Sequence, residues 1–410
     1  MERREFMSVL GGAAVIGRMG GSTDRRMAHP PIRPSVRLSQ EPALGPEVFA
    51  RRLDRLRTEL TTRKLDLFVA APGTNFEYFT GTNPGRSERL ILLHVPARGD
   101  AAIVCPAFEV DRVQQRSAVR DVRGWEEQDD PWKLVKAMLR ATKPTGRPGQ
   151  GAIEASLDYA SFLKLGEAGG SEWRWQTGAP VTERLRIIKY PEEMTLIRRA
   201  IAITEASIAA TFAGLVPGVT ERDVAGKLSN EMRSRGAPGG GLVQFGASSA
   251  MPHGGPGGGA LARETVVLID CGCRVGGYTS DITRTTWYGD APSEEFRTVY
   301  NLVHDAQTAA MTLGKPFRVR CQELDRAARR VIIDAGFGQY FTHRLGHGMG
   351  MDGHEPPYMV EGNDLPLEPG HVFTIEPGIY QPGKFGVRIE DDCLVTEAGI
   401  EVLSERPAKL

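Results

Sequence analysis

Short apolar runs separated by turn residues follow one amphipathic stretch in the first half of the chain. The stretch VFARRLDRLRTELTTRKL, residues 48–65, repeats apolar positions at helical spacing and predicts a helix. The runs LDLFVA, RLILLHVP and DAAIVCP, at residues 65–70, 89–96 and 100–106, are bounded by turn signals and predict strands. This order predicts a smaller α/β domain over residues 45–183.

The second half begins with two predicted helices and then changes to strand patterns. Pro191, followed by two glutamates, makes a good first helical turn, and Thr220 with Asp223 makes a capping pair for the next helix. A third helix is predicted over Ser293–Leu313, after two β-rich stretches. Helices outside a curved antiparallel sheet fit this order, so we expect an α+β domain over residues 184–410.

Several predicted strands and turns of this second domain carry an acidic residue or a histidine. The run TVVLID ends at Asp270, and GYTSDITRT, residues 277–285, carries Asp281 at its centre, so adjacent strands would bring the two carboxylates together. The segments HRLGHGMG, FTIEPGIY and GVRIEDD add His347, Glu376 and Glu390. Four carboxylates with one imidazole suit two divalent cations better than the His/Cys set of a structural zinc. We therefore interpret the chain as a metal-dependent hydrolase.

The order of these motifs resembles one known superfamily. An Asp, an Asp eleven residues later, HxxxHGxGxxxHE, IEPG and RIED occur in the methionine aminopeptidase, aminopeptidase P, prolidase and creatinase superfamily, and the likeness covers roughly residues 185–405. The spacing of the histidines is closest to the aminopeptidase P and prolidase branch. The segment APGTNFEYFTGTN, residues 71–83, resembles the N-terminal domain of that branch. The resemblance implies a pita-bread catalytic domain preceded by a creatinase-type domain.

The resemblance also implies roles for nine residues of this chain. The metal ligands would be Asp270, Asp281, His347, Glu376 and Glu390, with Asp281 and Glu390 bridging two ions. The residues around the substrate would be His253, His343, His354 and Arg388. Chemical reasoning adds that a carboxylate beside the ions can act as general base and then acid, and we assign this role to Glu376. Arg388 has an alternative role, an ion pair with Glu390 or Asp391.

The implied reaction is hydrolysis of the peptide bond between an N-terminal residue and proline. Oxygen-rich ligands favour manganese, with cobalt, iron or zinc as alternatives. The sequence leaves open whether the substrate is a dipeptide or a longer peptide. The same fold also serves small-metabolite hydrolysis, a metal-dependent lyase reaction and non-catalytic peptide binding, so these three functions stay open as well.

Composition excludes several other partners. The 410 residues include 51 basic and 51 acidic side chains. The chain therefore lacks the strongly basic net charge that would indicate nucleic acid as a partner. No apolar run reaches the roughly 18 residues that span a bilayer. Five cysteines, an odd number, do not describe a disulfide framework, and we expect Cys271 and Cys273 to pack beside Asp270. A homodimer or larger homo-oligomer is implied by the resemblance alone.

The N-terminus carries a possible export signal. Arg3 and Arg4, followed by Phe6 and a short apolar stretch, resemble a twin-arginine signal, so residues 1–44 are predicted to be a signal and linker of an exported, periplasmic protein. The alternative is a basic tail on a cytoplasmic protein.

The remaining glycines and histidines are given structural roles. The Gly-rich run from Gly236 to Gly259 lacks the Lys-Ser/Thr ending of a phosphate loop, and we predict a mobile substrate loop. Four histidines without a matching motif are predicted to be surface, hydrogen-bonded or structural residues: His29, His94, His304 and His371.

Overall fold

The computed structural model describes residues 44–254 and 259–410. The twin-arginine segment with Arg3 and Arg4 lies outside the described residues, as does His29.

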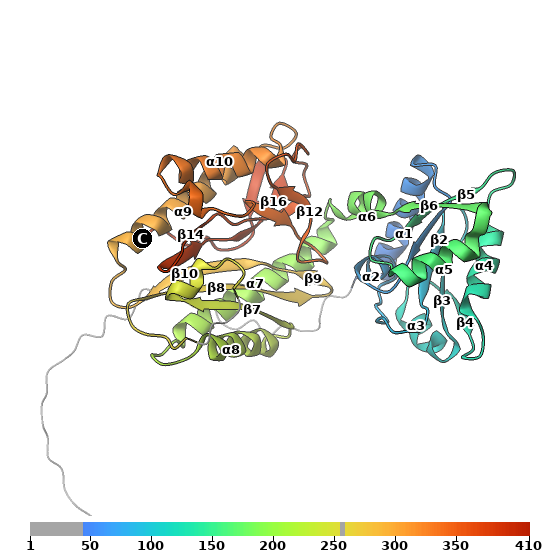
Figure 1. Ribbon diagram of the computed structural model, residues 1–410, viewed down its shortest axis with the longest axis horizontal. Helices are drawn as coiled ribbons and strands as arrows, with labels where there is room; N and C mark the ends of the chain where they lie inside the picture. The colour runs from blue at the N-terminus through green and yellow to red at the C-terminus, as the bar shows by residue number, and fades with distance from the viewer. Residues whose placement is uncertain (1–43, 255–258) are drawn as a thin grey trace, which may run out of the picture. The chain divides into compact units, whose positions relative to one another are not determined.

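A six-stranded mixed sheet organises the first part of the chain (Figure 1). Its spatial order is β4-β3-β2-β1-β5-β6. Strand β2 pairs antiparallel with both β1 and β3, whereas the other neighbouring strands pair in parallel, so β2 alone runs opposite to the rest of the sheet. The strands are β1 (Leu67–Ala70), β2 (Leu92–Pro96), β3 (Ala102–Pro106), β4 (Asp121–Trp125), β5 (Gly149–Ile153) and β6 (Trp173–Thr177).

Six helices accompany this sheet, and their starts follow the expected chemistry. A proline occupies the first turn of α1, and the Asp130 carboxylate accepts the Trp132 N–H at the start of α4. The helix and three strands predicted for this region are confirmed within a few residues. The helices are α1 (Pro46–Thr62), α2 (Thr74–Thr80), α3 (Val110–Arg116), α4 (Pro131–Thr142), α5 (Tyr159–Gly169) and α6 (Ala179–Arg186).

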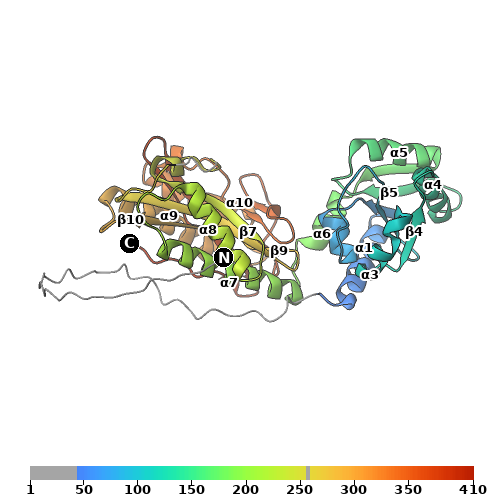
Figure 2. The ribbon, with the colours of Figure 1, turned by 90° about the horizontal axis from the view of Figure 1, so that it is seen from below.

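Four α-helices are described in the second part of the chain. Thr220 and Asp223 form the predicted capping box of α8, and the Ser293 hydroxyl accepts the Phe296 N–H at the start of α9. Helices α7 and α8 pack on the β7–β8 pair (Figure 2). Helix α9 packs on β13, β14 and β15. The helices are α7 (Pro191–Ala213), α8 (Glu221–Ser234), α9 (Glu294–Leu313) and α10 (Cys321–Asp334).

Every strand pair described in this second part is antiparallel. One sheet has the order β10-β8-β7, with β9 beside β8, a second has the order β12-β11-β13-β16-β17, and β14 pairs with β15. The strands are β7 (Gly239–Phe245), β8 (Thr265–Val275), β9 (Tyr278–Thr279), β10 (Ile282–Tyr288), β11 (Gly346–Gly348), β12 (Glu355–Met359), β13 (Val372–Ile375), β14 (Gly378–Gln381), β15 (Phe385–Arg388), β16 (Asp391–Thr396) and β17 (Gly399–Val402).

The prediction that Gly236 to Gly259 form one loop was wrong for its first half. Strand β7 pairs with β8 over its whole length, with Gly241 opposite Cys271. A Cβ atom added to Gly241 would lie 2.1 Å from the backbone oxygen of Asp270. Glycine therefore permits a close strand contact here, next to a candidate metal ligand.

His94 on β2 is a buried, hydrogen-bonded histidine, which is one of the roles predicted for it. Its Nε2 lies 3.2 Å from the Thr142 hydroxyl, and burial lowers its pKa to about 4. A lowered pKa means that the unfolded chain binds the proton first as the pH falls. The stability contributed by neutral His94 is therefore present above pH 6.5 and lost as the pH falls towards 4.

Replacing this histidine should reduce the acid sensitivity of the fold. Lowering a pKa from 6.5 to about 4 corresponds to about 3 kcal/mol, so wild type should lose about 3 kcal/mol more than His94→Gln between pH 7 and pH 4. Denaturant unfolding at a series of pH values measures the difference. Parallel pH profiles for the two proteins would contradict the assignment.

All five cysteines are buried free thiols: Cys105, Cys271, Cys273, Cys321 and Cys393. Cys273 packs against α7, where its thiol lies 3.3 Å from the Ala200 carbonyl oxygen. Among the residues described, no helix combines the length and the apolar character needed to cross a membrane.

Candidate metal centre

Strands and strand ends of different sheets position the five predicted metal ligands. Asp270 lies in β8, and Asp281 directly precedes β10. His347 is the central residue of β11, Glu376 follows β13, and Glu390 lies between β15 and β16.

Backbone hydrogen bonds join the sheets at this point. The Glu390 N–H donates to the Thr283 carbonyl at 3.2 Å, which connects the β15–β16 segment to β10. Asp270 faces Thr283 in the β8–β10 ladder, so the same pairing places β8 next to Glu390. The Glu376 N–H donates to the Leu345 carbonyl at 2.9 Å, beside β11. The convergence of the side chains therefore follows from the backbone pairing.

Three overlapping groups of possible ligand atoms result, and within each group the atoms lie within 4.8 Å of one another. The groups are Asp270, Asp281 and Glu390; His347, Glu376 and Glu390; and Asp281, His347 and His354. The structure thus brings all five predicted ligands into one cluster. His354, which was predicted as a substrate residue, lies at its edge.

Burial and crowding change the proton affinity of the carboxylates. Burial, followed by the negative charge of Asp270, raises the pKa of Asp281 well above its usual value. Burial, followed by the charge of Asp281, does the same to the pKa of Glu390. Burial raises the pKa of Glu376 to about 7, although Arg388 opposes the shift. Carboxylates this close repel one another when ionised, and a multivalent cation would relieve the repulsion.

The imidazole of His347 gives a second test of whether the cluster fits a metal. Its Nδ1 lies 3.1 Å from the Gly348 carbonyl oxygen, which can only accept, so Nδ1 carries the proton. Burial lowers the pKa of His347 to about 3, so the ring is neutral and Nε2 has a free lone pair. That lone pair faces Glu376 Oε1 at 3.3 Å and Asp281 Oδ2 at 3.7 Å. A nitrogen lone pair that faces two carboxylate oxygens forms a site that a cation between them would fit.

The three predicted substrate histidines lie around the same cluster. The His354 ring lies 3.7 Å from the His347 ring between centroids. His343 hydrogen-bonds through Nδ1 to its neighbour's carbonyl and through Nε2 to the Tyr380 hydroxyl at 2.8 Å. His253 is exposed and lies close enough for its charge to lower the pKa values of both His343 and His354. Burial is the main cause of both shifts, and it brings the pKa of His343 to about 4.

Arg388 does not make the ion pair that was suggested as its alternative role. Its guanidinium donates to Asp270 Oδ2 at 2.7 Å, not to Glu390 or Asp391. Asp391 instead pairs with Arg284 at 2.7 Å. The cause is the direction of β15, which aims the buried Arg388 side chain across to β8. Its role towards a substrate stays a prediction.

Sequence reasoning missed several residues that hold the cluster in place. The Thr283 hydroxyl donates to Glu390 Oε2 at 2.5 Å and accepts from Arg388 Nε at 3.0 Å. The Thr374 hydroxyl donates to Glu376 Oε1 at 3.1 Å, and the Tyr380 hydroxyl accepts from Arg388 Nη1 at 2.8 Å. Thr283 and Thr374 each lie two residues from a candidate ligand. In an extended strand, this spacing places each threonine on the same face as its candidate ligand. The sequence spacing could therefore have indicated both threonines.

The structure combines antiparallel sheets, flanking helices and a cluster of carboxylates with an imidazole. Comparison with known proteins identifies the chain as a metallopeptidase. Residues 195–397 match metallopeptidase family M24, and residues 52–188 match the creatinase/prolidase N-terminal domain. The chain belongs to family M24, and its enzyme class and fold class are as predicted. The exact domain limits at residues 44/45 and 183/184 stay predictions.

This chain is similar to individual relatives over nearly their whole length. The chain is 36% identical over 359 residues to an Xaa-Pro dipeptidase from Lactobacillus helveticus, which covers 86% of this chain and 96% of the relative. The crystal structure of dipeptidase PepE from Mycobacterium ulcerans is 36% identical, with a TM-score of 0.83 over 90% of this chain and 99% of that one. A prolidase from Thermococcus sibiricus is 32% identical, with a TM-score of 0.81 over 88% and 98%.

Proposed function

We propose that this enzyme hydrolyses the bond between an N-terminal residue and proline, using two divalent metal ions. The observation that carries the proposal is the convergence of four carboxylates and the neutral His347 within one buried cluster. Relatives named Xaa-Pro dipeptidase and prolidase support the substrate class and favour a dipeptide over a longer peptide.

The proposed ligands divide between two ions. Asp270 and Asp281 would hold one ion, His347 and Glu376 the other, and Asp281 and Glu390 would bridge them. When bound, the ions would supply Lewis-acid polarisation of the scissile carbonyl and lower the pKa of a water molecule. Hard oxygen ligands favour manganese, while cobalt, iron and zinc fit the same donor set.

Side chains of the cluster would carry the proton transfers. Glu376 would take the proton of the attacking water on a carboxylate oxygen and pass it to the leaving proline nitrogen. His354 and His253 would donate hydrogen bonds to the carbonyl oxygen as negative charge develops there. His343 would contact the substrate from its position beside Tyr380. Arg388 would orient Asp270 and face the substrate with its positive charge.

An assay with matched peptides tests this function. We expect an Xaa-Pro dipeptide to be hydrolysed, activity to vanish after EDTA treatment, and manganese to restore it. A longer Xaa-Pro peptide separates dipeptidase from aminopeptidase activity, and an Xaa-Ala dipeptide is the control for the proline requirement. No release from either proline peptide, with metal bound, would overturn the proposal in favour of a small-metabolite substrate.

Two further features belong to the same proposal. We expect a homodimer or larger homo-oligomer, which sedimentation of the purified enzyme would measure. We also expect export through the twin-arginine route, which fractionation of cells producing the full chain and an Arg3→Lys/Arg4→Lys variant would measure. An equal distribution of the two proteins between compartments would contradict export.

A further inference from the structure

The loop between β11 and β12 carries His354 to the edge of the metal cluster. It spans residues 349–354 and connects His347 on β11 to Glu355 at the start of β12. The two imidazole rings lie 3.7 Å apart between centroids. The position of this loop therefore decides where His354 lies relative to the cluster.

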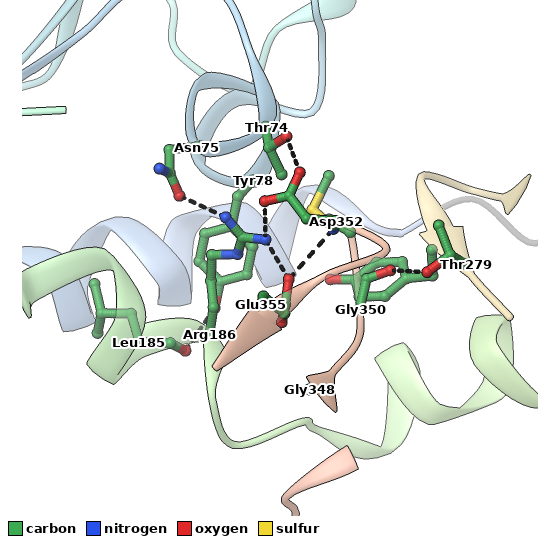
Figure 3. Close-up of polar contacts among 12 residues, drawn as sticks. Thr74, Asn75, Tyr78, Leu185, Arg186, Thr279, Gly348, Gly350, Asp352 and Glu355 are labelled. Atoms are coloured by element: carbon green, nitrogen blue, oxygen red, sulfur yellow. Dashed lines mark hydrogen bonds and ion pairs between the residues drawn. The ribbon is translucent and has the colours of Figure 1, made fainter. Parts of the chain in front are cut away.

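Residues from the first part of the chain hold the loop on one side (Figure 3). Arg186, the last residue of α6, donates through Nη2 to Asp352 Oδ2 at 2.7 Å and also to Glu355 Oε2. The Thr74 hydroxyl, at the start of α2, donates to the other Asp352 oxygen at 2.6 Å. Both carboxylates that flank His354 are thus bound to the same guanidinium.

The arginine is itself fixed in a buried network. Its Nη1 donates to Asn75 Oδ1 at 3.0 Å, and Lys189 Nζ donates to Glu355 Oε1 at 2.6 Å. The side chains of Arg186 and Glu355 are 10% and 6% exposed. Two cations therefore balance two carboxylates, and water screens little around Glu355, whereas the Asp352 side chain is 40% exposed. Removing Arg186 would leave Asp352 with a hydroxyl as its only side-chain partner among the contacts described.

The opposite side of the loop is attached to strands of the metal cluster. Both the N–H and the hydroxyl of Thr279 donate to the Gly350 carbonyl, at 2.8 and 3.0 Å. Arg274 Nη2 donates to the Met351 carbonyl at 2.7 Å. Thr279 lies two residues before Asp281, so the loop is held between the α2 and α6 contacts and the segment that supplies a candidate ligand.

We propose that Arg186 is a positioning residue for His354. By holding Asp352 and Glu355 at once, it fixes the 349–354 loop so that the His354 ring lies against His347 and faces the substrate carbonyl. In the described part of the chain, the side-chain hydrogen bonds of Arg186 go to Asn75, Asp352 and Glu355 and not to a candidate metal ligand, so it would act through the loop. What His354 then does rests on the proposed function, whereas the fixing of the loop does not.

Variants at three positions test the proposal by kinetics. Arg186→Met should lower kcat on the order of 10- to 100-fold with metal content retained, since a misplacement of about 1 Å can cost 100-fold. The double variant Arg186→Met/His354→Ala should be no slower than His354→Ala within about twofold, because both changes remove the same contribution. Thr74→Val removes one loop contact without changing charge and should lower kcat several-fold. Arg198→Met is the control, because it breaks an exposed pair with Glu401.

Hydrogen exchange gives a readout that does not depend on turnover. In Arg186→Met, amide exchange should speed up in peptides that cover residues 349–354 and stay unchanged in β8 and β13. Unchanged exchange in the loop, or kinetic effects of Arg186→Met and His354→Ala that multiply in full, would overturn the proposal. If Arg186→Met does not fold, Thr74→Val and Asp352→Asn carry the same test. Wild type without Xaa-Pro turnover would overturn the proposed function, while the exchange result would still decide the positioning role.

Discussion

Replacing Asp281 by alanine should abolish turnover while leaving the fold intact. The change removes a carboxylate that is within reach of both candidate ion positions, because Asp281 belongs to two of the three ligand groups. Losing about 4 kcal/mol of charge stabilisation corresponds to a rate about 1,000-fold lower. Peptide hydrolysis measures the turnover, metal analysis measures the bound metal per chain, and circular dichroism measures whether the fold is intact.

Asp290→Ala is the matched control for this experiment. Asp290 is also an aspartate near a strand end, but its side chain is 88% exposed and forms an ion pair with the exposed Arg263. Its loss should change neither rate nor metal content, since exposed pairs contribute little. Full activity of Asp281→Ala in metal-depleted buffer would contradict the assigned site.

The crowded carboxylates of the metal-free enzyme should contribute less stability as the pH rises, and metal should reverse this loss. Burial raises the pKa of Glu376 from 4.5 to about 7, so the unfolded chain releases this proton first as the pH rises. The stability from protonated Glu376 is present below pH 4.5 and lost as the pH rises through about 7, a change on the order of 3 kcal/mol. The pKa values of Asp281 and Glu390 are raised too and act in the same direction.

Bound metal changes the sign of this effect, because its ligands must be deprotonated and it binds only the folded cluster. In EDTA these carboxylates should lower the free energy of unfolding between pH 5 and pH 8, against the increase that the buried His94 contributes in the lower part of this range, and the increase caused by manganese should grow from pH 5 to pH 8. Unfolding with urea, with and without metal, measures both slopes. Relative to wild type, Asp281→Ala in EDTA should lose less stability between these pH values, and an identical pH dependence would contradict the crowded-carboxylate explanation.

The candidate ligands could be predicted from sequence because each lies in a short motif with its own strand or turn context. Asp270 ends an apolar run, and Glu376 lies within IEPG, so ordered spacing was enough to select them. Helices with clear caps, such as α8 after Thr220, were predictable for the same reason: their signals are local.

Contacts between distant segments could not be predicted in this way. The alternative role of Arg388 was an ion pair with a sequence neighbour, but its guanidinium pairs with Asp270, 118 positions away. The contact of Arg186 with Asp352 joins residues 166 positions apart, and no local pattern marks either side chain. Glycines misled the interpretation of β7, because a run that reads as a loop also permits unusually close strand pairing.

All five cysteines are buried, so we expect their thiols to react slowly with oxidants while the enzyme stays folded. Burial raises the pKa of the Cys105 and Cys321 thiols to about 11 and about 12, so the reactive thiolate form is rare. An oxidant or an alkylating reagent would reach these sulfur atoms only after the sheets that cover them separate. A protein that folds before it enters an oxidising compartment would keep all five as thiols, and the rate of their chemical labelling would report how often the fold opens.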